Sequence, residues 1–359
     1  MDLNTTSLCG KSVQLYIFLP WVQGVLITLY VVIFVIGIGG NLLVLAVVLG
    51  NKHMRTPINI YLLNLSASDI IMCLFSIPMA PTTTFFGHWV FGAALCKILP
   101  LGQNMSVHMS TFTLTAIAVD RYRAVFYPFS TRTNSLSKTG VIILSINIFA
   151  IIITLPYSLI TKIELDKNGS WQCEEVWPQR MQWIYRPLST CIHNIIQFVI
   201  PFTTIVICYT RIMLKLRHRA LGRLISRTTE QILEDAARTA RMNKMLIAMV
   251  VIFGICWLPI NLLLGFIHLA SDPSCWELYY LSFFIVHVIA MSSACYNPIF
   301  YGLLNTAFNK TELLPKCCPC VINTATTDRQ DDKRQGCRFA GRWALAAVEG
   351  MNMEGITSV

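Results

Sequence analysis

Charged side chains placed against long apolar segments are the groups in this chain best suited to chemistry. Asp120 and Arg121 stand at the end of an apolar segment that runs from about 99 to 119, and Tyr122 follows them. Charge at the edge of a membrane span is costly and usually has a function there. One further carboxylate, Asp69, falls inside another apolar segment. These groups suit ion pairing or recognition of a partner.

Catalysis is not indicated by the sequence. It contains no metal-ligand spacing, nucleophile elbow or phosphate-binding loop, and Asp69 has no catalytic partner. We therefore expect a protein that is not an enzyme. An ion-coupled transporter would also use charge within the membrane, but it normally shows internal repeats or broken helices, and no repeat is apparent.

Membrane helices must position these groups, because the composition describes a chain solvated by lipid. Of the 359 residues, 55% are hydrophobic and 13% are charged, and the mean hydropathy is +0.58. Each apolar segment is long enough to cross about 30 Å of hydrocarbon. We predict an all-α membrane protein, a seven-transmembrane helix bundle with spans at about 23–49, 58–81, 98–126, 139–160, 188–214, 243–269 and 278–304.

The placement of Lys and Arg predicts the orientation in the membrane. Of the 28 Lys and Arg residues, 22 lie in the segments 51–57, 120–138, 211–244 and 305–359. Since cytoplasmic loops carry the excess of positive charge, we expect an extracellular N-terminus and a cytoplasmic C-terminus at the plasma membrane. The net charge of +10 is then a topology signal, and nucleic acid is not an expected partner.

The same reasoning divides the chain. We expect an extracellular N-terminus over 1–22, a membrane domain over 23–304, an amphipathic membrane-surface helix over 305–316, and a mostly disordered cytoplasmic tail over 317–359. No cleavable signal peptide is visible in the first 20 residues, so we expect the first span to direct insertion.

Cysteines and sequons on the two sides predict modifications. Cys96 and Cys173 both face the oxidising side, which favours a disulfide between them; Cys9 and Cys275 share that side and are a second candidate pair. Juxtamembrane cysteines on the inner side suit palmitoylation, and the alternative of a zinc-like cluster lacks a fourth ligand. These are Cys317, Cys318 and Cys320. The sequons expected outside begin at Asn4 and Asn168.

Polar and proline residues recur within the predicted spans. An unpaired polar group at this depth costs several kcal/mol, so such side chains are expected to meet inside the bundle. They are Asn41, Asp69, Trp257 and Asn297. Prolines within spans remove a backbone hydrogen bond and favour kinks. They are Pro78, Pro156, Pro201, Pro259 and Pro298.

Taken in order, the motifs resemble the signature set of rhodopsin-like (class A) G-protein-coupled receptors over about residues 23–314. The residues that carry the resemblance are Gly40-Asn41, Asn64-Leu65-Ser66-Ala67-Ser68-Asp69, Asp120-Arg121-Tyr122, Phe253 with Cys256-Trp257-Leu258-Pro259, and Asn297-Pro298-Ile299-Phe300-Tyr301. Asn147 departs from the family, which usually has tryptophan there.

A narrower resemblance is to receptors of the neuropeptide Y and short neuropeptide F group. Gln103 stands where amine receptors carry an aspartate, His287 lies eleven residues before Pro298, and Trp89-Val90-Phe91-Gly92 follows the second span. The resemblance implies an extracellular peptide ligand. Gln103 and His287 offer hydrogen bonds suited to an amidated peptide terminus; the alternative is that they satisfy each other or a buried water. A receptor for an amine or another non-peptide ligand is the nearer rival.

Acidic residues are predicted around the extracellular mouth. Glu174 and Glu175, in the loop after the fourth span, are candidates to attract a basic peptide. A solvated acidic rim is the alternative.

The resemblance also implies a mechanism. A peptide would press on Gln103 and Trp257, and the helices would pivot with Phe253 at Pro201, Pro259 and Pro298. At the inner face, Arg121 would leave Asp120 and contact a heterotrimeric G protein, which the resembling group implies is of the inhibitory Gi/o class. Tyr209 and Tyr301 would close in behind it.

Two features modify this expectation. Thr239 stands where the family usually has an acidic partner for Arg121, so we expect measurable ligand-free signalling. Asp69, Ser110 and Asn297 form a candidate sodium site, with a hydrated protonatable carboxyl as the alternative. No other cofactor is expected.

The chain ends in Thr357-Ser358-Val359, which matches a ligand for PDZ domains. Basic residues of the third inner segment suit an acidic partner or anionic membrane lipid.

Overall fold

Long helices make up most of the chain that the computed structural model describes, which comprises residues 19–127, 136–165, 169–176, 182–223, 230–269 and 279–304. In chain order the elements are α2 (Pro20–Gly50), the 3₁₀ turn η1 (Lys52–Met54), α3 (Pro57–Phe86), α4 (Gly92–Phe126), α6 (Leu136–Ile160), β1 (Thr161–Leu165), β2 (Trp171–Glu175), α7 (Gln182–Asn194), the π-helical segment η2 (Ile195–Val199), α8 (Ile200–Arg223), α9 (Glu230–Leu269) and α10 (Tyr279–Leu304).

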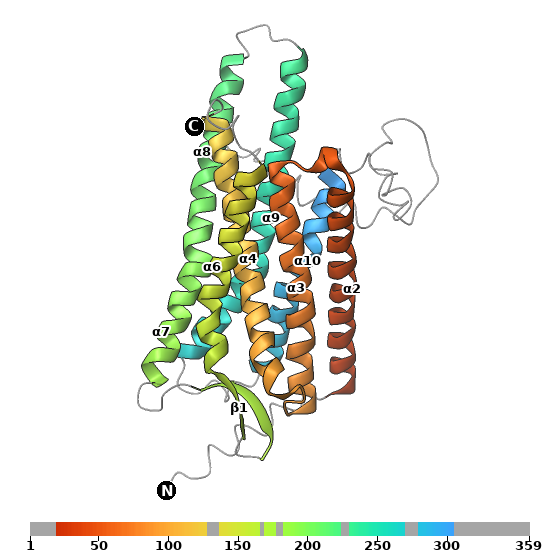
Figure 1. Ribbon diagram of the computed structural model, residues 1–359, viewed down its shortest axis with the longest axis vertical. Coiled ribbons are helices and arrows are strands. Elements are labelled where there is room, and N and C mark those ends of the chain that lie inside the picture. The colour runs from red at the N-terminus through yellow and green to blue at the C-terminus, as the bar shows by residue number, and fades with distance from the viewer. Residues whose placement is uncertain are drawn as a thin grey trace, which may run out of the picture.

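The predicted seven-helix bundle is confirmed. The spans correspond to α2, α3, α4, α6, the continuous run α7–η2–α8, α9 and α10. The helices lie side by side along one axis, and the hairpin of β1 and β2 covers one end (Figure 1). At the opposite end, α8 and α9 extend past the other helices (Figure 1). We call these the hairpin end and the arginine end, because Arg121 lies near the latter.

The distribution of side chains is that of a membrane protein. Large apolar side chains such as Val35, Ile152 and Leu262 point outward, whereas Asn41, Ser68 and Asp69 are buried inside. Six helical segments of the described residues are long and apolar enough to cross a membrane. The seventh long helix, α4, packs against α3, α6 and α8 and keeps its polar side chains inside the bundle, so it has less need of apolar residues facing lipid.

Close approaches between helices depend on glycine, and Gly40 and Gly254 are two examples. A Cβ placed on Gly40 would lie 2.9 Å from Pro298, and one placed on Gly254 would lie 2.8 Å from the ring of Phe202. Both distances are shorter than ordinary carbon contacts. Gly40 therefore lets α2 approach α10, and Gly254 lets α9 approach the aromatic face of α8.

Pro201 changes the helix that precedes it. Because proline has no backbone N–H, it cannot donate to the carbonyl of Gln197, four residues earlier, and the helix takes π geometry over Ile195–Val199. At Pro78, Pro156, Pro259 and Pro298 the helix continues through the proline.

The hairpin is a feature that the sequence analysis did not predict. β1 and β2 pair antiparallel, with Ile163 opposite Cys173 and Thr161 opposite Glu175. It forms directly after α6 ends at Ile160.

Several predictions lie outside the described residues. These are the glycosylation sites Asn4 and Asn168, the pair Cys9 and Cys275, the surface helix 305–316, the cysteines Cys317, Cys318 and Cys320, and the terminal Thr357-Ser358-Val359. They remain predictions.

Candidate functional site

A disulfide ties the hairpin to the start of α4. Cys96 and Cys173 are bonded, with their Cα atoms 5.7 Å apart, which confirms the predicted pair. Cys96 is fully buried within the first turns of α4. The bond therefore holds β2 over this end of the bundle.

Backbone and side-chain hydrogen bonds reinforce the same attachment. The Trp89 backbone N–H donates to the Trp171 carbonyl at 2.6 Å, and Gln172 Nε2 donates to the Gly87 carbonyl at 2.7 Å. The Trp89 indole is buried against Cys96 and donates from Nε1 to the Gly92 carbonyl at 2.8 Å. These hydrogen bonds thus hold the segment from Gly87 to Gly92 against the hairpin.

The two acidic residues of β2 have different environments. Glu174 is exposed, whereas Glu175 is half-buried and its Oε1 accepts a hydrogen bond of 2.6 Å from Tyr157 on α6. Glu174 is therefore the carboxylate that is more open to solvent, and Glu175 also serves to join the hairpin to α6.

Gln103 and His287 lie on different helices and have different surroundings. Gln103 is half-buried on α4, and its backbone carbonyl accepts from Ser106 Oγ. His287 is buried on α10, where Nδ1 shares a hydrogen bond of 2.8 Å with the Tyr30 hydroxyl of α2. The Phe283 ring stacks on His287 at a centroid distance of 5.4 Å. His287 is therefore held through Tyr30, a partner that the sequence analysis did not identify.

A column of aromatic rings links the fifth and sixth spans. Phe198, Phe202, Phe253 and Trp257 stack in sequence, with centroid distances of 4.3, 6.2 and 5.9 Å. Trp257 is buried, and its Nε1 donates to Ser293 Oγ at 3.1 Å. A displacement of Trp257 would thus be transmitted to α8 through Phe253 and to α10 through Ser293.

Asp69 lies in a buried polar cluster between α3, α4 and α10. Its Oδ2 accepts from Asn297 Nδ2 at 2.7 Å. Ser110 shares a hydrogen bond of 2.7 Å with Ser68, the neighbour of Asp69. The predicted meeting of polar side chains is thus confirmed for Asp69 and Asn297.

The remaining interior polar groups have other partners. Asn41 donates to the carbonyls of Gly37 and Ala294 instead of bonding to Asp69. Asn147, which stands in place of tryptophan, donates to Asn64 Oδ1 at 3.1 Å. Each amide therefore joins two helices.

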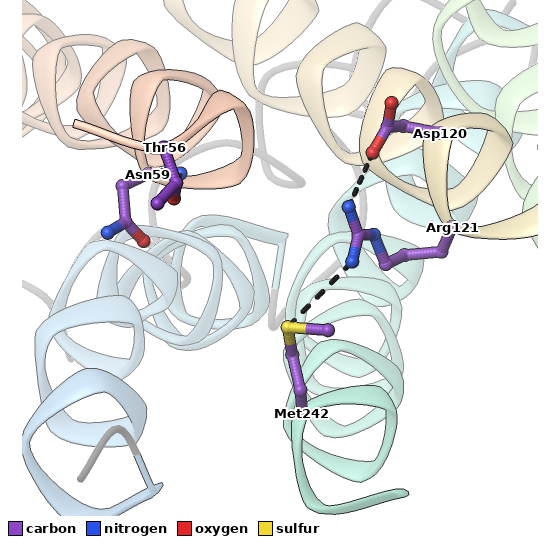
Figure 2. Close-up of polar contacts among 5 residues, drawn as sticks. All are labelled: Thr56, Asn59, Asp120, Arg121 and Met242. Atoms are coloured by element: carbon purple, nitrogen blue, oxygen red, sulfur yellow. Dashed lines mark hydrogen bonds and ion pairs between the residues drawn. The ribbon is translucent and has the colours of Figure 1, made fainter. Parts of the chain in front are cut away.

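Arg121 contacts its own neighbour and a sulfur atom of α9. Its Nη2 donates to Asp120 Oδ2 at 2.6 Å, and its Nη1 lies 3.9 Å from Met242 Sδ (Figure 2). The side chains of Arg121 and Asp120 are 19% and 11% exposed, so the ion pair is mostly shielded from solvent. A thioether is a weak acceptor. Among the described residues, the hydrogen-bonding contact of Arg121 with another helix is therefore a weak one.

In Figure 2, Thr56 and Asn59 lie at the start of α3, at the same end of the bundle. Thr56 caps that helix by accepting from the Asn59 backbone N–H, and Asn59 Nδ2 donates to the Met54 carbonyl at 2.6 Å. The hydrogen bonds at the start of α3 are thus made with neighbouring residues of the same segment.

Aromatic residues surround the arginine end. The Tyr122 and Phe126 rings stack at 4.5 Å, and Lys215 Nζ of α8 lies 4.4 Å from the Phe126 centroid. Tyr209 and Tyr301 are both buried, and Tyr209 Oη has no hydrogen-bond partner among the residues that the structure describes. These contacts join α4 to α8 beside Arg121.

Sequence reasoning missed Met242, Lys215 and Tyr30. Met242 directly precedes Asn243 on α9, three residues after Thr239, and only the rotation of α9 shows which residue faces Arg121. The amphipathic spacing of α8 gave no sign that Lys215 would lie over an aromatic ring.

The chain is similar in sequence to known proteins. A family model described as "7 transmembrane receptor (rhodopsin family)" matches residues 40–301. The Neuropeptide F receptor of Drosophila melanogaster is 33% identical over 317 residues, which cover 83% of this chain and 64% of that protein. The chain thus spans less than two thirds of the fly protein's length.

Two further relatives match at similar identity. The Neuropeptide Y receptor type 2 of Mus musculus is 33% identical over 297 residues, covering 81% of this chain and 76% of that protein. The Neuropeptide receptor npr-1 of Caenorhabditis elegans is 30% identical over 367 residues, covering 90% of this chain and 76% of that protein.

Proposed function

The chain belongs to the rhodopsin family of seven-transmembrane receptors, and we propose from that membership that it binds an extracellular neuropeptide and activates heterotrimeric G proteins. Its family consists of receptors, not enzymes. The observation that carries the peptide proposal is the likeness to neuropeptide receptors of three animals over about four fifths of the chain or more. Each of those relatives is named for a neuropeptide ligand class.

We infer that the hairpin end faces outside the cell at the plasma membrane. The described parts of the segments 51–57, 120–138 and 211–244, which carry excess Lys and Arg, fall at the arginine end. The disulfide of Cys96 and Cys173 at the hairpin end suits an oxidising compartment. This orientation gives an extracellular N-terminus and a cytoplasmic C-terminus.

The peptide pocket is proposed to lie below the hairpin. Gln103 is an uncharged, half-buried side chain of α4, so it can donate to and accept from a terminal amide without needing a cationic partner. His287 and Trp257 would form the inner part of the pocket, and Glu174 and Glu175 its acidic rim. A basic peptide with an amidated terminus fits these groups. The competing proposal is an amine or other non-peptide ligand, and the lack of a carboxylate at Gln103 disfavours an amine.

Coupling is proposed at the arginine end. Among the described residues, Arg121 would give up the pair with Asp120 and the weak contact with Met242 in order to meet a G protein. The aromatic column through Trp257 and Phe253 supplies the connection from the pocket, with Pro259 and Pro298 as pivots. Tyr122, Tyr209 and Tyr301 are proposed to take part in this coupling. We expect the inhibitory Gi/o class, as for the resembling receptor group.

A sodium ion is proposed beside Asp69. Carboxylate, hydroxyl and amide oxygens of Asp69, Ser110 and Asn297 are hard ligands of the kind that alkali and alkaline-earth cations prefer. Ser110 already bonds to Ser68, and Asp69 accepts from Asn297. Binding of an ion would require these two hydrogen bonds to lengthen or break. A hydrated protonatable carboxyl remains the alternative for this cluster.

The tail proposals depend on the sequence alone. Palmitoylation of Cys317, Cys318 and Cys320 would hold the tail at membrane lipid. A PDZ domain would bind Thr357-Ser358-Val359 by strand addition.

A ligand screen tests the proposal. Cells expressing the full chain would be exposed to a panel of amidated neuropeptides and a matched panel of amines, with cAMP and calcium as readouts. We expect a fall in stimulated cAMP with at least one amidated peptide. A response to amines and none to peptides would overturn the peptide proposal.

A further inference from the structure

Two histidines face each other inside the bundle, away from the residues considered so far. His108 of α4 and His193 of α7 have ring centroids 4.5 Å apart and planes inclined by 77°. His108 is 0% exposed, and His193 is partly buried. The pair therefore joins the third span to the fifth, and His193 is its more exposed member.

The hydrogen bonding of His108 defines which nitrogen carries the proton. Its Nδ1 lies 2.8 Å from the Asn104 carbonyl oxygen. A carbonyl can only accept, so Nδ1 carries a hydrogen and donates it. In the neutral ring Nε2 then has a lone pair. Nε2 is buried and has no hydrogen-bond partner among the residues that the structure describes.

This is the arrangement that histidine ligands of metals use. A metal-bound imidazole usually donates its other N–H to a carbonyl or carboxylate, which fixes the tautomer and the ring orientation. Asn104 provides that support for His108. A second imidazole at close range supplies the next ligand, and imidazole nitrogen suits Zn²⁺ and Cu²⁺.

We propose that His108 and His193 bind a divalent transition-metal ion, Zn²⁺ or Cu²⁺, between α4 and α7. Tetrahedral bonds of about 2 Å would place two imidazole centroids about 5 Å apart, so a small rotation of the rings from 4.5 Å accommodates the ion. No group of three or more His, Cys, Asp or Glu that could hold a metal occurs among the described residues. The remaining positions therefore go to water or to Gln197, which is buried one turn after His193 and within its hydrogen-bonding reach.

The position of the site suggests that a bound ion would restrain the fifth span. Gln197 lies in the π-helical segment η2, four residues before Pro201. An ion that bridges His108 and His193 would fix this segment against α4. A metal–ligand bond would then have to break before the fifth span could move. The ion would therefore modulate the receptor from a site separate from the peptide pocket.

Zn²⁺ titration of the purified full-length protein tests the proposal. After treatment with EDTA, added Zn²⁺ should raise the unfolding temperature, followed by tryptophan fluorescence. His108→Gln and His193→Gln each remove a ligand, so each should weaken the apparent affinity by at least the roughly 10–100-fold that loss of an outer-shell partner costs. His193→Cys, which restores a zinc ligand, should recover the shift. His88→Gln makes the same change at an exposed histidine and should leave it unaltered.

Two further measurements make the result decisive even if a glutamine variant folds poorly. Cu²⁺ bound to the unaltered protein should give an electron paramagnetic resonance spectrum with splitting from two imidazole nitrogens. A protein in which Cys317, Cys318 and Cys320 are replaced by serine should keep the Zn²⁺ shift. Absence of nitrogen splitting, or loss of the shift with the tail cysteines, would overturn the site.

Discussion

The two ends of the bundle are held together in different ways. At the hairpin end, a disulfide ties β2 to α4, and one backbone and one side-chain hydrogen bond tie it to the loop before α4. At the arginine end, Arg121 Nε, Tyr209 Oη and Asn243 Nδ2 are buried without a hydrogen-bond partner among the described residues. A buried polar group left unpaired costs about 1–3 kcal/mol. The contacts at the hairpin end therefore favour a single conformation. At the arginine end, a rearrangement or a partner that forms hydrogen bonds to these groups would lower the free energy.

This difference fits a protein that receives a ligand at one end and changes shape at the other. A pre-formed surface at the hairpin end lowers the ordering cost of binding. Unsatisfied groups at the arginine end lower the cost of leaving the inactive arrangement. Variants that weaken the hairpin end or strengthen the arginine end test this contrast.

Breaking the disulfide should have the largest effect. Cys96→Ser removes a cross-link between residues 77 apart in sequence, which should lower the free energy of unfolding by about 2–5 kcal/mol. The hairpin would separate from α4, so peptide binding should fall with it. Surface expression and the unfolding temperature measure the change. Cys191→Ser, at an exposed free thiol, is the control, and equal behaviour of the two variants would refute the rigid role of this end.

Supplying an acid at the arginine end should have an intermediate effect. Met242→Glu places a carboxylate where the Met242 sulfur contacts Arg121. A new, partly shielded ion pair worth about 1 kcal/mol would reduce the active fraction about fivefold. Ligand-free signalling, which we expect to be measurable in the unaltered protein, should drop accordingly.

Met242→Leu is the matched control, since it keeps the shape of the side chain without its sulfur. It should leave ligand-free signalling close to that of the unaltered protein. If basal signalling of the unaltered protein already equals that of untransfected cells, the view of a loosely held Arg121 is wrong.

Removing one hydrogen bond at the hairpin end should have the smallest effect. Tyr157→Phe deletes the donor to Glu175 Oε1, and the disulfide remains to hold β2. We expect a loss of about 1 kcal/mol or less in stability and a severalfold loss at most in peptide potency. Concentration–response curves measure it against Tyr185→Phe, an exposed tyrosine of α7. A loss as large as that of Cys96→Ser would show that the disulfide does not dominate this end.

The membrane spans and the disulfide could be predicted from the sequence. Apolar segments predicted every span, and the side on which Cys96 and Cys173 fall predicted their pairing, because hydrocarbon thickness and redox state leave few alternatives. Asp69 and Asn297, 228 residues apart, were expected to meet since neither can remain unpaired in lipid.

Contacts that depend on the rotation of one helix relative to another could not be predicted from the sequence. Tyr30 and His287 are 257 residues apart, and only the packing of α2 on α10 brings their polar atoms together. Met242 lies against Arg121 in the structure, and this contact depends on the rotation of α9. The hairpin was missed because its strands are only five residues long and contain Lys and Glu among few apolar residues.

Arg121→Ala, assayed for both peptide binding and G-protein activation in the same membranes, tests the central claim most directly. Its control is Arg123→Ala, an exposed arginine two residues away on the same helix. We predict that Arg121→Ala abolishes peptide-stimulated activation while peptide affinity stays near that of the unaltered protein, and that Arg123→Ala keeps both. Unchanged activation in Arg121→Ala would contradict the account.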